Sequence, residues 1–161
     1  MMIGAFLLFC LLVSAATQAQ ALRPCVSYGE YAANADYLSP ERAQGLADCI
    51  GAQPWGEGLK TWFANSPGFN LDKIKVPVLM EEHDPISLIY GWDAYALLPL
   101  QHKPIDLLYM RDGGHVLSKP RERFVSQEMN ADWFDFWLNG HEDPDPYKSK
   151  QYERWRSLKG H

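Results

Sequence analysis

A chain of 161 residues is long enough for one domain or a large part of one. Its hydrophobic content of 47% can supply a core, and a formal net charge of −5 without a basic stripe argues against a nucleic-acid partner. The cysteines and histidines lack the spacing of a zinc site.

The first 21 residues have the layout of a secretory signal peptide. Residues 4–16 are mostly apolar but too few to span a bilayer, which takes about 20 residues. Ala-Gln-Ala at positions 19–21 is a suitable cleavage site before Leu22. No Lys or Arg precedes the run, so a buried segment of a longer domain is the alternative. We therefore expect an exported protein, periplasmic or extracellular, with no membrane span after cleavage.

The chain has three cysteines, one of which lies in this leader. Cys10 would leave with the signal peptide, and Cys25 and Cys49 could then pair in an oxidising compartment. Spacing alone cannot decide between a disulfide and two free thiols, and both interpretations stay open.

The segment before the first strand is predicted to be irregular at residues 22–38 and helical after it. Ser39 suits a helix cap, Pro40 suits the first helical position and Gly51 suits the end. A short helix is predicted around residues 59–64.

A strand–helix–strand unit follows. Strands are predicted at residues 76–80 and 105–110, and the first is apolar at successive positions, which is typical of a parallel strand buried on both faces. Residues 87–98 between them have helical periodicity. A long helix is then predicted from Lys119 to Gly140, and residues 147–158 are expected to be partly helical. The predicted domains are a signal peptide (1–21), a partial α/β domain (22–140) and a polar C-terminal extension (141–161).

An acid and a histidine follow the ends of these two strands. Asp84 comes after the first, and His115 follows Gly113 and Gly114 after the second. If the strands are parallel neighbours, both loops lie at the sheet edge where α/β folds bind ligands. In a serine-type acyl transfer, His115 would be the general base and Asp84 the carboxylate that orients it.

Other carboxylates compete with Asp84 for this role. Glu82 is the most serious rival, because a loop shift of two residues would exchange the two, and Glu81 and Asp93 are further candidates.

The nucleophile is the weak point, because no Gly-x-Ser-x-Gly occurs. Ser66 is followed by Pro67, which has no N–H for an oxyanion hole, and it lies too close to Asp84 for an intervening strand and helix. Ser27, in Cys-Val-Ser-Tyr-Gly, is preceded by a poor strand. A surface histidine and a solvated acidic loop are the simpler interpretations of His115 and Asp84.

Five blocks of sequence carry a resemblance to a known family. They are Ser-Pro-Gly-Phe-Asn-Leu-Asp-Lys-Ile (66–74), Val-Pro-Val-Leu-Met (76–80), Lys-Pro-Ile-Asp-Leu (103–107), the stretch from Gly-Gly-His-Val-Leu to Lys-Pro-Arg-Glu-Arg (113–123) and Asp-Trp-Phe-Asp-Phe-Trp-Leu-Asn-Gly (132–140). Together they resemble the C-terminal part of the catalytic domain of prolyl oligopeptidase-type serine peptidases. The tail, with Glu-Asp-Pro-Asp-Pro (142–146) and Tyr-Glu-Arg-Trp-Arg (152–156), resembles the branch that includes bacterial lasso-peptide isopeptidases.

The resemblance implies a partial α/β-hydrolase fold, the C-terminal half of a mostly parallel sheet with flanking helices. It implies peptide or isopeptide substrates and no metal or other cofactor. It puts the triad histidine at His115 and the acid in the loop that holds Asp84. Ser27 echoes the serine of the family's nucleophile elbow, but the glycine before it is missing.

Two functions are therefore compared. The first is a serine-type peptidase with a Ser-His-Asp mechanism, truncated here and inactive as an isolated chain for want of a competent nucleophile. The alternative is an inactive exported binding or interaction domain derived from the same fold. In either case an incomplete sheet favours self-association.

Overall fold

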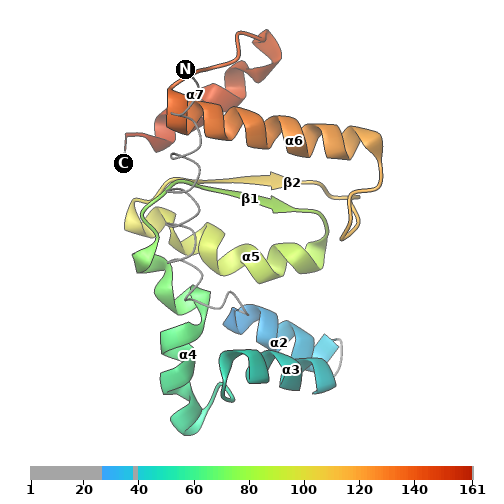
Figure 1. Cartoon of the computed structure of the whole chain (residues 1–161), viewed down its shortest axis with the longest axis vertical. Coiled ribbons are helices and arrows are strands. Elements are labelled where there is room, and N and C mark those ends of the chain that lie inside the picture. The colour runs from blue at the N-terminus through green and yellow to red at the C-terminus, as the bar shows by residue number, and fades with distance from the viewer. Residues whose placement is uncertain (1–26, 38–39, 161) are drawn as a thin grey trace, which may run out of the picture. The chain divides into compact units, whose positions relative to one another are not determined.

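The computed structural model describes residues 27–37 and 40–160, which fall into two compact units with the boundary between Asn70 and Leu71 (Figure 1). The predicted signal peptide, Cys10, Cys25 and the predicted cap Ser39 lie outside the described residues. Within the described part, no helix is both long and apolar enough to cross a membrane. The two units are taken separately below.

The first unit is helical. It contains α2 (Tyr28–Tyr37), α3 (Pro40–Ile50) and α4 (Leu59–Asn65), with a 3₁₀ turn at Gly56–Gly58 and another beginning at Pro67. The predicted helices α3 and α4 are confirmed, and Gly51 ends α3 with φ of 100°. The irregular segment predicted over residues 22–38 is wrong for α2. Ser27 precedes that helix as its N-cap, and its Oγ accepts the Glu30 N–H at 3.0 Å.

Trp62 is the centre of this first unit. Its side chain is fully buried, its Nε1 donates to the Ala52 carbonyl at 2.7 Å, and the Tyr31 ring meets it edge-on at 5.4 Å. Tyr31 belongs to α2 and Trp62 to α4, so this contact packs α2, the helix that was not predicted, against α4. Cys49 of α3 is disulfide-bonded; since Cys25 is not described, the Cys25–Cys49 pairing stays a prediction.

The second unit contains the strand–helix–strand pattern: β1 (Val78–Glu82), α5 (Pro85–Leu97) and β2 (Ile105–Tyr109). The two strands pair in parallel, from Val78 opposite Ile105 to Glu82 opposite Tyr109. The fold of this unit is thus mixed α/β with a small parallel sheet. β1 begins and ends two residues later than predicted, which makes Glu81 and Glu82 strand residues and not loop residues.

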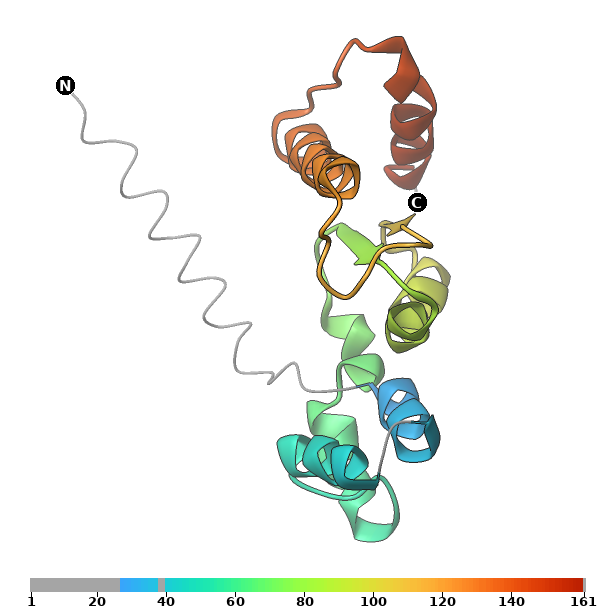
Figure 2. The same cartoon turned by 90° about the vertical axis from the view of Figure 1, so that its right-hand side faces the viewer.

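Helices cover both faces of this sheet, with α5 on one side and α6 (Pro120–Phe134) on the other (Figures 1 and 2). Side chains of β1 alternate between these layers, as a strand requires. Val78 and Met80 pack with Leu98 on the α5 side, whereas Leu79 packs with Trp133 on the α6 side.

The C-terminal segment completes the core on the α6 side. A π-helical turn (Asp135–Asn139) ends at Gly140, and a 3₁₀ turn (Pro146–Lys148) leads into α7 (Ser149–Leu158). The prediction that residues 147–158 are partly helical is confirmed. Although the segment was expected to be a polar extension, Tyr152 and Trp155 are buried against α6.

A buried aspartate ties α7 to the sheet. Asp106 of β2 is 7% exposed and accepts hydrogen bonds from Arg154 Nε at 3.0 Å, from Arg154 Nη2 at 2.7 Å and from Trp155 Nε1 at 2.6 Å. A buried carboxylate needs such partners. Because Arg154 and Trp155 lie nearly 50 residues from Asp106 in the sequence, no local pattern predicts these hydrogen bonds.

Candidate functional site

Two loops leave the sheet at one edge, as predicted. Because β1 and β2 are parallel and in register, Glu82 and Tyr109 end the strands side by side. The loop after β1 carries His83 and Asp84, and the loop after β2 runs through residues 110–119 with His115 near its middle. This is the carboxyl edge at which open α/β sheets place ligands.

The two loops are in direct contact at Gly113. A Cβ added at this glycine would lie 3.0 Å from His83 Cβ and 3.2 Å from the His83 carbonyl oxygen. The Gly113 N–H donates to the Met110 carbonyl at 2.9 Å, which turns the chain sharply after β2. A glycine at this position is thus explained by close backbone approach as well as by the turn.

Asp84 is the N-cap of α5. Its Oδ1 accepts the backbone N–H groups of Ile86 at 2.8 Å and Ser87 at 2.9 Å, and Ser87 Oγ accepts the Asp84 N–H at 3.2 Å. This is a capping box, in which free helix N–H groups are satisfied reciprocally. Asp-Pro-x-Ser is a recognisable capping sequence, and it identifies Asp84 as a helix cap as well as a candidate acid. Within the described residues, Oδ2 of Asp84 has no hydrogen-bond partner.

His115 lies exposed in the second loop. In the part of the chain that the structure describes, no hydrogen bond or ion pair joins its imidazole to a carboxylate. The structure therefore brings together the loops that hold Asp84 and His115, but it does not pair the two side chains.

The rival carboxylates point elsewhere. Glu81 faces α6, where it accepts hydrogen bonds from Ser126 Oγ at 2.6 Å and from Asn130 Nδ2. Its Oε2 also lies 3.9 Å from His83 Nε2, a buried ring nitrogen that lacks a hydrogen-bond partner among the described residues. Asp93 belongs to α5 and not to the loop.

Glu82 faces α5, where its Oε1 would lie 2.6 Å from a Cβ added at Gly91. Burial raises the pKa of this carboxyl group above 4.5, and a hydrogen bond with Ser87 and the neighbouring His83 offset the rise only in part. Folding therefore shifts the ionisation of this half-buried acid to higher pH.

The raised pKa of Glu82 gives a pH dependence that can be measured. Between pH 4.5 and the raised pKa the folded chain holds more protons than the unfolded chain, so stability falls as pH rises. Glu82→Gln should flatten this decline and raise the free energy of unfolding at pH 7. Urea denaturation between pH 4 and 7 measures it, with the exposed Glu57→Gln as the control. The same slope in Glu82→Gln as in the wild type would contradict the prediction.

Neither candidate serine has the setting of a nucleophile. Ser27 caps α2 through its hydroxyl, in a Ser-x-x-Glu capping pattern that was readable from the sequence. Ser66 is fully buried and precedes Pro67, and its carbonyl accepts from Asn70 Nδ2 at 2.8 Å. Both serines lie in helical surroundings of the first unit.

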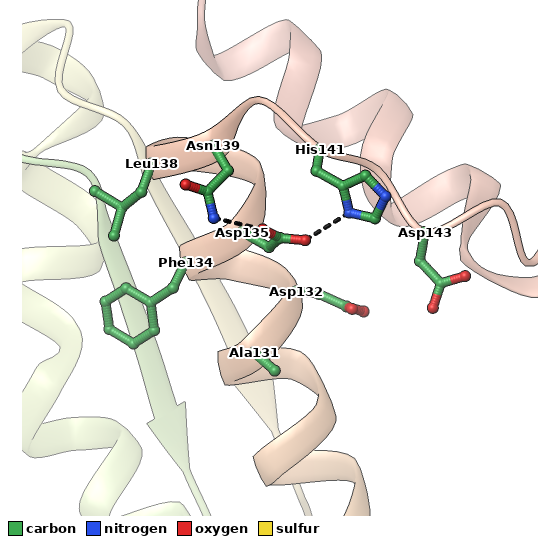
Figure 3. A pocket seen from close by; sticks show the side chains of 8 residues that line it. All are labelled: Ala131, Asp132, Phe134, Asp135, Leu138, Asn139, His141 and Asp143. Atoms are coloured by element: carbon green, nitrogen blue, oxygen red, sulfur yellow. Dashed lines mark hydrogen bonds and ion pairs between the residues drawn. The ribbon is translucent and has the colours of Figure 1, made fainter. Parts of the chain in front are cut away.

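A surface hollow of about 400 Å³ lies at the C-terminal end of α6, lined in part by Phe134 and Leu138. Both Asn139 and His141 point to Asp135 there: Asn139 Nδ2 lies 2.6 Å from Asp135 Oδ1, and His141 Nδ1 lies 2.5 Å from Asp135 Oδ2 (Figure 3). Two hydrogen bonds lower the pKa of Asp135, and the one from Asn139 has a larger effect than the one with His141. The part of α6 from Pro120 to Ala131, roughly 16 Å long, separates this hollow from the His115 loop. Among the described residues, no cluster suited to a metal ion is found.

Comparison with known proteins points to one enzyme. The chain is 32% identical over 98 residues to the lasso peptide isopeptidase AtxE2 of Asticcacaulis excentricus. A solved structure of a serine-to-alanine variant of AtxE2 with Astexin3-dC4 bound matches with a TM-score of 0.67 and 26% identity, over 84% of this chain. The apo AtxE2 structure matches with a TM-score of 0.61 and 28% identity, over 74% of this chain. No family model matches the chain.

The chain is homologous to AtxE2, an isopeptidase of the prolyl oligopeptidase family. The predicted resemblance to prolyl oligopeptidase-type peptidases is thereby confirmed. The matched region is 61% of this chain and 14% of AtxE2, and the structural matches cover 20% and 18% of the AtxE2 chains. The chain thus spans about one fifth of the isopeptidase that it resembles.

Proposed function

We propose that this chain carries the histidine and acid part of a serine-type peptidase of the prolyl oligopeptidase type, acting on peptide or isopeptide bonds on an α/β-hydrolase scaffold. One observation supports this most strongly. In a homologue of an isopeptidase, the parallel pair β1 and β2 delivers an acidic loop and a histidine loop to one edge, in contact through Gly113 and His83.

In this proposal His115 is the general base, and Asp84 holds its ring in the required tautomer and stabilises its charged form. The cap at α5 occupies Oδ1 of Asp84 and leaves Oδ2 to accept a hydrogen bond from the imidazole N–H. The separation of the two side chains does not oppose these roles, because catalytic hydrogen bonds are often long in apo structures and tighten when substrate binds.

The proposed substrate is a peptide. The peptide-bound structure of AtxE2 supports this by homology, and the apolar N-terminal leader supports a periplasmic or extracellular location. In the described sheet, β1 and β2 each have one unpaired edge, which supports self-association through further strand pairing.

The isolated chain is proposed to be inactive. Ser27 is used as a helix cap and Ser66 is buried before a proline, so neither can reach a substrate with an activated hydroxyl. The catalytic serine of the complete reaction would therefore have to come from a hydrolase segment like that of AtxE2.

A fluorophosphonate probe, which labels activated serines, tests this proposal on two proteins. The first is the 161-residue chain, for which we expect no covalent labelling. The second is a hybrid in which residues 71–161 replace the segment of AtxE2 that aligns with them, with circular dichroism as the check on folding. We expect labelling of the hybrid. Labelling of the isolated chain that is lost in Ser27→Ala, or a folded hybrid that is not labelled, would overturn the proposal. A folded hybrid without activity would favour the binding-domain alternative.

A further inference from the structure

The loop that carries His115 is closed at its base by a lysine. Lys119 Nζ donates a hydrogen bond to the backbone carbonyl of Asp112 at 2.8 Å, seven residues earlier in the chain. Lys119 also holds the N-cap position directly before α6, with an extended backbone (φ −80°, ψ 131°). The bond therefore joins the two ends of the loop, with His115 between them.

The same ammonium group has a second partner in the first turn of α6. Glu122 Oε1 lies 2.8 Å from Lys119 Nζ, and the Glu122 side chain is only 18% exposed. The hydrogen bond to Glu122 raises the pKa of Lys119, so the lysine is a charged donor at neutral pH. Glu122 thus anchors the lysine to the helix while the lysine holds the carbonyl of the loop.

The start of the loop is fixed from the other side as well. Gly113, directly after the carbonyl that Lys119 binds, lies against His83 of the neighbouring loop and donates to the Met110 carbonyl. His83 in turn is held through its backbone N–H, which donates to Ser87 Oγ at 3.2 Å. The turn before His115 therefore packs against His83 in the loop after β1, and Lys119 at the start of α6 binds it through the Asp112 carbonyl.

We propose that Lys119 is a positioning residue for His115, which it keeps at the sheet edge by closing the loop through the Asp112 carbonyl. This role rests on the proposed function of His115 as the base. The competing explanation is that Lys119 only stabilises the start of α6 through Glu122. That explanation confines the effect of Lys119 to the first turn of α6 and predicts no change in the loop.

Three variants of the full chain separate these explanations. Lys119→Met removes both bonds and keeps the aliphatic stem, Lys119→Arg keeps a charged donor, and Glu122→Gln weakens only the helix partner. NMR order parameters of the Gly114, His115 and Val116 amides and the line shapes of the His115 ring protons are the readouts. Lys60→Met, which removes the exposed Lys60–Glu57 pair at 2.6 Å, is the matched control.

For the wild type we expect order parameters near 0.85, falling below about 0.6 in Lys119→Met. Lys119→Arg should restore the order, Glu122→Gln should loosen the loop less than Lys119→Met because the bond to the Asp112 carbonyl remains, and Lys60→Met should leave the order unchanged. An equally ordered loop in Lys119→Met, a loop already mobile in the wild type, or a loop that loosens as much in Glu122→Gln would overturn the proposal. This experiment measures motion and not hydrolysis. The proposed role of Lys119 can therefore be contradicted while the peptidase proposal stands, and the peptidase proposal can be contradicted while the role of Lys119 in ordering the loop stands.

Discussion

Trp155→Ala is expected to lower the free energy of unfolding of the second unit by about 3–5 kcal/mol, the usual cost of truncating a buried tryptophan. Trp155 is fully buried, and its ring meets Trp133 edge-on at 5.1 Å and Phe136 at 5.5 Å. Its Nε1 also donates to the buried carboxylate of Asp106. Truncation therefore leaves a cavity and removes one partner of that aspartate.

Urea denaturation followed through the amide signals of β2 measures this loss. Tyr147→Ala is the matched control, because this aromatic side chain precedes α7 but is 96% exposed; its effect should stay within about 0.5 kcal/mol. Trp155→Phe keeps most of the ring but not the donor, and should lie between the two. If Trp155→Ala cost no more than Tyr147→Ala, α7 would be an appendage and not part of the core.

His115→Ala is expected to slow peptide hydrolysis by the hybrid by at least about 1,000-fold. Loss of the general base of a triad leaves only the contribution of substrate binding and oxyanion stabilisation. His102→Asn is the matched control. His102 is a histidine next to β2 in a left-handed conformation (φ 54°), which asparagine tolerates, and it precedes β2 whereas His115 follows it. It should leave the rate unchanged, and equal losses in both variants would remove His115 from the mechanism.

Much of the architecture could be predicted from local patterns. Gly51 and Gly140 end helices with positive φ, as glycines after a periodic apolar stretch do. The helix between two apolar runs predicted the parallel pairing of β1 and β2, because parallel neighbours need a crossover connection. That pairing also predicted that the loops after the two strands lie at the same edge of the sheet, and the structure adds their contact at Gly113 and His83.

The errors arose where one short pattern had two meanings. Ser-Tyr-Gly at residues 27–29 resembles part of a nucleophile elbow, whereas in the structure Ser27 is a helix cap. Glu81 and Glu82 looked like loop residues because they are charged. They belong to β1 because α6 offers Ser126 and Asn130 to the first and α5 offers Ser87 to the second. The partners of Glu81 lie 45 and 49 residues away in the sequence and cannot be predicted from the strand itself.

The most direct test of the proposed site is a double-mutant cycle between Asp84 and His115 in the hybrid. Asp84→Asn is the suitable change, because asparagine still caps a helix and only the charge is lost. Peptide hydrolysis is measured for the hybrid, both single variants and the double variant. If the two side chains act as one catalytic unit, the double variant should be about as slow as His115→Ala alone. If the two losses multiply, or if Asp84→Asn has no effect, Asp84 is only a helix cap and the acid–histidine pair does not exist.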